Sequence, residues 1–310
     1  MRAAWLAAAA LVGLMALAAC GGSAPVSAPA QPTAAPVLQV PTVDPGDGEL
    51  ESHLATKVLE VGTQRVAFLL NTQKALVKAP QVHISVASAD GSVPPTEITA
   101  PYNAWPYGVR GSYAAPVDFP APGDYRLTVM PVGGEVTGEA VIDVSVLEDS
   151  PIPSVGEPAP PSETKTLDDP AEITNLTTAY DPDDELYRIS ISDAIESGRP
   201  SVVVFATPAF CTSPTCGPQV DTVSELRVEH PDAANYIHVE LYDNPEAIQG
   251  DLSRAELVPA ADEWGFTQIP GWTNESWVFV LDGDGVVRHR FEGFATLMEL
   301  KAALAEVDGL

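Results

Sequence analysis

Basic residues are scarce in this 310-residue chain. Fifteen Lys and Arg stand against 43 Asp and Glu, which gives a formal net charge of −28 at pH 7. Such a chain repels phosphates, so we expect no nucleic-acid partner and no surface attraction to anionic lipid. The sequence also lacks an evident Ser-His-Asp arrangement and an evident phosphate-binding glycine loop.

Long apolar runs are absent beyond the first 19 residues, so no later segment is expected to span a membrane. The first run follows Arg2 and ends at Ala19, which is typical of a secretory signal. The residues Leu17-Ala18-Ala19-Cys20 resemble a bacterial lipobox. This resemblance implies a signal peptide over 1–19, a lipid on Cys20 and a lipid-anchored protein on the extracytoplasmic face of the cell membrane. The alternative is an ordinary signal peptide with an incidental cysteine.

Cysteine is rarer still, with three residues in all. If Cys20 carries a lipid, Cys211 and Cys216 remain as an even pair. Disulfides persist in the oxidising space outside the cytoplasm, so we predict a disulfide between these two residues.

Composition divides the rest of the chain into four parts. Residues 20–48 are rich in Ala, Pro, Ser and Val and predict a flexible tether. Residues 49–149 alternate short β segments with turns, residues 150–164 are proline-rich and predict a stiff linker, and residues 165–310 show an α/β pattern.

Residues 49–149 predict a β-sandwich of roughly seven short strands. The clearest strand patterns lie at 64–70, 81–86, 124–129 and 140–146. The stretch Phe119–Val129 resembles the late hairpin of immunoglobulin-like modules on bacterial surface proteins. We interpret this part as a spacer or partner-binding module.

The α/β part predicts strands at 201–206, 236–242, 276–281 and 286–291, with helices near 189–198, 218–229 and 295–307. Phe205–Cys211 and Phe279–Val287 resemble the thioredoxin superfamily, in which a cysteine follows the first buried strand. The resemblance implies a thioredoxin-like domain. It is best matched by bacterial surface proteins that join an immunoglobulin-like module to such a domain.

The cysteine spacing departs from that family, because four residues rather than two separate Cys211 from Cys216. Ser276 stands where thioredoxins place a cis-proline, and no buried acid is evident beneath the pair. With Trp277, Pro208 and Thr212, Ser276 is expected to line the site.

Five steps along a helix rise about 7.5 Å, whereas the Cα atoms of a disulfide lie about 4.4–6.8 Å apart. The pair is therefore predicted to close a loop, with the next helix starting near Pro218.

Two functions fit this pair. Cys216 at a helix N-terminus and an accessible Cys211 favour thiol–disulfide exchange or redox sensing with a protein thiol client. Alternatively, the bridge only staples a loop in a non-catalytic surface interaction module. No cofactor is required by either hypothesis.

Two further alternatives rest on other families. The peroxiredoxin Q type shares the CxxxxC spacing, but Pro208 stands where its threonine is expected. Sco-type copper chaperones use two cysteines and a distant histidine. The candidates here are His238, in a strand, and His289, between two arginines that would repel a cation. We therefore predict no metal site.

Overall fold

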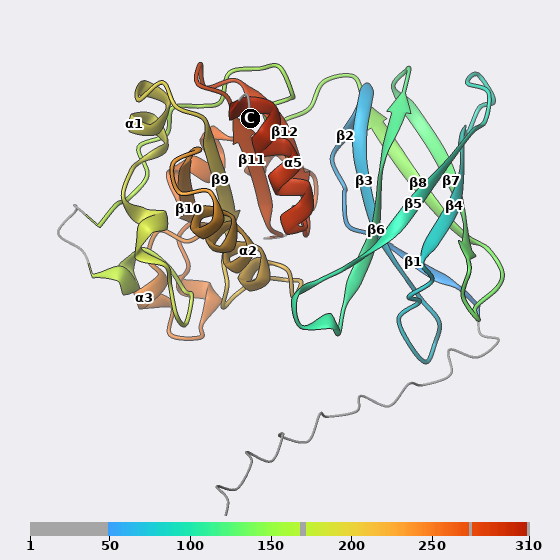
Figure 1. The fold of residues 1–310 in the computed structure, drawn as a ribbon, viewed down its shortest axis with the longest axis horizontal. Coiled ribbons are helices and arrows are strands. Elements are labelled where there is room, and N and C mark those ends of the chain that lie inside the picture. Colours follow the sequence, from blue (N-terminus) through green and yellow to red (C-terminus); the bar gives the residue numbers. More distant parts are fainter. Residues whose placement is uncertain (1–48, 168–171, 273–274, 309–310) are drawn as a thin grey trace, which may run out of the picture. The chain divides into compact units, whose positions relative to one another are not determined.

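The computed structural model describes residues 49–167, 172–272 and 275–308 (Figure 1). The predicted signal peptide, Cys20 and the tether lie outside these residues. The described residues contain one eight-stranded and one four-stranded sheet, with five α-helices. The expected combination of a β-rich part and an α/β part is therefore confirmed.

The eight-stranded sheet has the order β1-β3-β6-β5-β4-β7-β8-β2. Its strands alternate inward and outward residues: in β8, Ala140, Ile142, Val144 and Val146 are buried and the residues between them are exposed. The strands are β1 (Glu51–Leu54), β2 (Leu59–Glu60), β3 (Gly62–Asn71), β4 (Gln81–Ser88), β5 (Thr96–Ala104), β6 (Gly111–Phe119), β7 (Gly123–Val132) and β8 (Ala140–Leu147).

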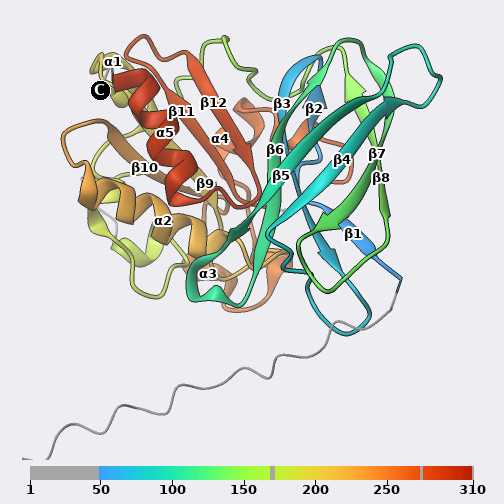
Figure 2. The same ribbon diagram turned by 45° about the vertical axis from the view of Figure 1, so that its right-hand side comes forward.

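This sheet curls around a single apolar core. β5 pairs with β4 through residues 96–101 and with β6 through residues 102–104, so it belongs to both halves of the curl (Figure 2). The Ser52 hydroxyl on β1 donates to the carbonyl of Val141 on β8 at 2.8 Å, which brings two distant strands together. Phe68, Tyr113 and Phe119 are fully buried inside.

The four-stranded sheet has the order β10-β9-β11-β12, with β9 and β10 parallel and the other pairs antiparallel. All six residues of β9 are buried, as the unbroken apolar run predicts. Its strands are β9 (Ser201–Ala206), β10 (Asn235–Glu240), β11 (Trp277–Leu281) and β12 (Val287–Glu292).

Helices cover both faces of this sheet. Val202 and Val204 of β9 pack with helices α2 and α5, whereas Val203 and Phe205 pack with α1 and α4. The helices are α1 (Ile191–Glu196), α2 (Cys216–Glu229), α3 (Pro245–Ile248), α4 (Pro259–Glu263) and α5 (Leu297–Asp308). Short 3-10 turns lie at Pro106–Gly108, Ile173–Asn175, Asp184–Tyr187, Leu252–Arg254 and Phe266–Gln268.

The proline-rich stretch 150–164 packs on the α/β part. Ile152 is 1% exposed, and the amide of Ala159 donates to the carbonyl of Gly285 at 2.9 Å. Val287 of β12 donates to the carbonyl of Glu157 at 2.8 Å. We call residues 151–162 the strap. Composition alone predicts a spacer here, but the strap is held as an added edge on β12.

Charged side chains that connect the curled sheet to the α/β part are buried. One carboxylate oxygen of Glu292 accepts from the amides of Lys57 and Val58 at 2.7 and 2.9 Å. Arg290 pairs with Glu60 at 3.1 Å. Burial raises the pKa of Glu292 to about 7, despite the opposing amides and cations.

This burial makes stability depend on pH. Between about 4.5 and 7 the unfolded chain releases the Glu292 proton while the folded chain keeps it, so stability falls as pH rises across that window. The shift corresponds to about 3 kcal/mol. Glu292→Gln is expected to remove this contribution to the pH dependence of the free energy of unfolding. Urea unfolding at pH 4.5 and 8 measures that dependence.

The wild type and Glu292→Gln share all other titrating groups. The difference between their pH dependences of the free energy of unfolding is therefore the contribution of Glu292. Asp118→Asn, at an exposed position of β6, serves as the control and should keep the wild-type slope. Equal slopes in Glu292→Gln and the wild type would contradict the prediction.

Candidate functional site

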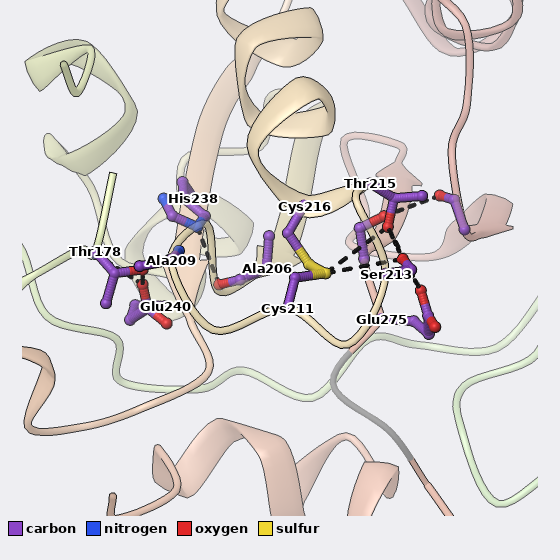
Figure 3. The surroundings of a disulfide bond; sticks show 12 residues. Thr178, Ala206, Ala209, Cys211, Ser213, Thr215, Cys216, His238, Glu240 and Glu275 are labelled. Carbon is purple, nitrogen blue, oxygen red and sulfur yellow. Dashed lines mark hydrogen bonds between the residues drawn. A yellow bond between two sulfur atoms is a disulfide. The ribbon is translucent and has the colours of Figure 1, made fainter. Parts of the chain in front are cut away.

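A disulfide joins Cys211 and Cys216 where β9 passes into helix α2 (Figure 3). β9 ends at Ala206, and a nine-residue connection carries Cys211 before the helix begins at Cys216. The two Cα atoms lie 6.0 Å apart, within the usual range for a disulfide. The predicted bond is confirmed, and it closes a loop as the spacing requires.

Helix α2 starts two residues earlier than predicted. Cys216 is its first residue, and Pro218 occupies the third position. The first-turn amides of a helix have no partner within the helix, so proline is tolerated there. Thr215 precedes the helix without a capping hydrogen bond from its side chain. The sulfur of Cys216 therefore belongs to the N-terminal turn itself.

The two sulfur atoms differ in exposure. Cys216 is fully buried in the apolar cluster that also contains Val220, Val223 and Ala206. Cys211 is partly exposed and packs at the edge of the same cluster. A reagent from solution therefore has access to Cys211 before Cys216.

A polar cluster lies beside Cys211. The hydroxyl oxygens of Ser213 and Thr215 are 3.9 and 3.8 Å from its sulfur and 2.7 Å from each other. The Ser213 hydroxyl donates to the carboxylate of Glu275, and the Thr215 hydroxyl lies 3.5 Å from the same oxygen. The cluster thus connects the accessible sulfur to a carboxylate that precedes β11 (Figure 3).

The negative charge of Glu275 disfavours a second anion at Cys211. A thiolate there would compete with the carboxylate for the same hydroxyl protons. The Ser213 hydroxyl lies between the two groups, and two charges about 6 Å apart in water interact by about 0.7 kcal/mol, and by more near a protein surface. Glu275→Gln is therefore expected to make reduced Cys211 react about threefold faster with iodoacetamide at neutral pH.

Glutamine keeps a hydrogen-bonding oxygen at the same place, so the loop should stay folded. Glu263→Gln, at an exposed position of α4, is the matched control and should react at the wild-type rate. Equal rates in all three proteins would show that Glu275 does not influence the thiolate.

On the other side of the disulfide lies a buried acid that the sequence analysis did not place. Glu240 ends β10, and one of its oxygens accepts from both the amide and the hydroxyl of Thr178 at 2.8 Å. The amide of Ala209, in the loop before Cys211, donates to the Thr178 hydroxyl at 3.0 Å. Burial raises the pKa of Glu240, and hydrogen bonds from Thr207 and Thr178 oppose that shift.

His238, two residues earlier, is also buried. Its Nε2–H donates to the Ala206 carbonyl at 3.2 Å, so Nδ1 of the neutral ring accepts from the Tyr187 hydroxyl at 2.6 Å. Burial lowers the pKa of His238 to about 4, so the ring is neutral at pH 7. These contacts fix the end of β9 beneath the loop, so His238 is a core residue.

The other expected site residues are divided between loop and core. Pro208 is partly exposed and Thr212 is exposed, both in the loop that carries Cys211. Ser276 is buried and donates to the carbonyl of Gly293 at 3.1 Å. Trp277 is 1% exposed and packs against Phe266 with ring centroids 5.6 Å apart, so it is a core residue.

Neither a metal cluster nor a membrane span is found in the part of the chain that the structure describes. No three His, Cys, Asp or Glu side chains there are arranged to hold a metal ion. No helix among the same residues is long and apolar enough to cross a bilayer. His289 forms a contact with Glu306 at 3.0 Å.

Comparison with known proteins adds no relative to this description. No protein-family model matches the chain, and no curated protein or solved structure matches it significantly. The function of the site therefore has to be argued from its own geometry.

Proposed function

We propose that this chain is a thiol–disulfide exchange protein that acts through Cys211 and Cys216. The observation that carries the proposal is the unequal exposure of the two sulfurs, one accessible and one buried in the first turn of a helix. A bridge with this asymmetry has a defined point of attack and a defined leaving group.

The reaction begins when a thiolate from a reductant or client attacks the Cys211 sulfur. A new bond forms to Cys211, the Cys211–Cys216 bond breaks, and Cys216 leaves as a thiolate. The positive end of the α2 dipole stabilises that anion. A second thiol of the same reductant then displaces Cys211 and becomes part of the reductant's disulfide. The protein gains two electrons and two protons, and the reductant loses the same number.

Fold and location are part of the same proposal. A mixed four-stranded sheet with helices on both faces and a cysteine after a buried strand supports a thioredoxin-like domain. The curled sheet before it supports an immunoglobulin-like spacer or partner-binding module. The lipobox-like residues before Cys20 support lipid anchoring on the extracytoplasmic face of the membrane, where a thiol client would be met.

The decisive experiment is the reduction potential of the pair in the full chain, equilibrated with glutathione or thioredoxin couples. A potential above about −250 mV is expected, because an exchange-competent bridge is easily reduced. A value below about −300 mV would indicate a structural staple and favour the non-catalytic interaction module instead.

Anchoring is tested separately. Cys20→Ser is expected to move the protein from the membrane fraction to the soluble extracytoplasmic fraction if cleavage still occurs, or to leave an uncleaved precursor. Incorporation of labelled fatty acid should disappear in either case. Cys211→Ser is the control and should keep the lipid. Labelling of Cys20→Ser at the wild-type level would contradict lipidation at this residue.

A further inference from the structure

A groove of about 320 Å³ lies along helix α2, outside the disulfide site just described. One wall comes from the segment before the 3-10 turn at Asp184–Tyr187, and the other comes from the helix. The lining residues are Ala179, Asp181, Pro182, Asp183, Val220, Asp221, Ser224, Glu225 and Val228.

The groove begins close to the disulfide. Val220 lies four residues after Cys216 in the same helix, so the two side chains share a face one turn apart. Both belong to one apolar cluster. A chain bound along α2 therefore runs toward the sulfur pair.

The floor of the groove is apolar. Val220, Ala179 and Pro182 contribute to it, and Val228 at its far end is 63% exposed. Tyr180, between two lining residues, is fully exposed. Exposed apolar side chains around a hollow are typical of a surface that binds another chain.

Its rim is negative. Asp183 forms an ion pair with Arg227 at 2.8 Å and accepts a hydrogen bond from the Ser224 hydroxyl at 2.5 Å. Among the described residues, no Lys, Arg or His forms an ion pair with Asp181, Asp221 or Glu225. Partial desolvation raises the pKa of Asp221, and the charge of Asp181 adds to that rise. A cation between these carboxylates would relieve their repulsion.

We propose that the groove binds a cationic segment of the client protein, in which Lys or Arg alternates with apolar residues beside the reactive cysteine. The inference rests on the proposed exchange function and names its substrate class. The long stem of Lys or Arg fits the apolar floor while its charge meets the carboxylates. A second copy of this chain is a poor occupant, because two proteins of charge −28 repel each other.

Peptide binding to the groove is tested with peptides that cannot undergo thiol–disulfide exchange. Two fluorescent peptides of equal length, one with three Lys and one with three Glu among Val and Ala, carry serine in place of cysteine. The full chain is expected to bind the Lys peptide at least about tenfold more tightly at low salt, and the gap should shrink as salt is added.

A matched pair of variants distinguishes the effect of the groove carboxylates on affinity from the effect of the protein's net charge. Asp221→Asn with Glu225→Gln removes two groove charges, and Asp118→Asn with Glu139→Gln removes two exposed charges from the eight-stranded part. The first variant is expected to lose about tenfold in affinity for the Lys peptide, and the second should bind like the wild type. Equal losses in both variants, or equal affinity for both peptides, would overturn the inference.

The exchange function is read in a second assay. The reduced full chain is mixed with the same peptides carrying a cysteine blocked as a nitrothiobenzoate mixed disulfide, and release of nitrothiobenzoate is followed. Release from both peptides, faster with Lys, is expected. Binding of the Lys peptide without release of nitrothiobenzoate would contradict the exchange function and support the groove as a binding site. Equal release from both peptides, with no charge preference in binding, would support the exchange function and contradict the groove.

Discussion

Cys216→Ser is expected to trap a covalent adduct on Cys211, whereas Cys211→Ser is expected to form none in the folded protein. Cys211 is partly exposed, so its thiol can attack a disulfide from solution. In wild type the Cys216 thiol then displaces the attached group, and without it the mixed disulfide persists. In Cys211→Ser the remaining thiol is fully buried and out of reach.

Mass spectrometry measures this after incubation of each reduced variant with oxidised glutathione. The Cys216→Ser protein should gain one glutathione almost completely, and the Cys211→Ser protein should stay unmodified until denaturant is added. Either substitution also removes a short covalent loop, which is expected to cost about 2 kcal/mol of stability. Equal modification of both variants in the absence of denaturant would mean that the loop opens freely and that exposure does not direct the reaction.

Local patterns predicted the parts of the fold that depend on local physics. An unbroken run from Ser201 to Ala206 is apolar because both faces of β9 are covered, and the strand has the predicted bounds. Alternation in residues 140–146 likewise reports one buried face, and that range lies within β8. The disulfide was predictable because only two cysteines remain once Cys20 is set aside.

Contacts between residues far apart in the chain could not be predicted from the sequence. Ser213 and Glu275 are 62 positions apart, and no sequence pattern around either residue indicates their hydrogen bond. Glu240 did carry a signal, because a carboxyl inside an apolar strand needs a partner. That partner, Thr178, lies 62 positions earlier in an irregular segment.

Composition was misleading at the strap. Prolines favour extended backbone and resemble a spacer, but extended backbone is also what an added sheet edge requires. The buried side chain of Ile152 and the backbone bonds to Gly285 and Val287 decide between these two possibilities, and both are tertiary features.

Gly265→Ala is expected to be among the most destabilising single substitutions in the chain. Gly265 has φ of +76°, and a Cβ atom there would lie 1.8 Å from the carbonyl oxygen of Pro151. That oxygen belongs to the backbone at the start of the strap, so the conflict cannot be relieved by turning a side chain. The neighbouring Trp264 is fully buried and donates to the Ser162 hydroxyl at 3.1 Å, which ties the same region to the other end of the strap.

Relief therefore requires the strap to move away from the core, which would uncover Ile152 and disturb Trp264. We expect Gly265→Ala to lower the free energy of unfolding by at least about 3 kcal/mol in urea titrations. Gly250→Ala is the matched control, because its φ is +82° and nothing lies within 4 Å of the added atom. It should lose only the left-handed backbone penalty of about 1–2 kcal/mol. Similar losses in the two variants would mean that the strap yields without cost and does not stabilise the α/β part. A clearly larger loss in Gly265→Ala would establish the proline-rich stretch as part of the folded core.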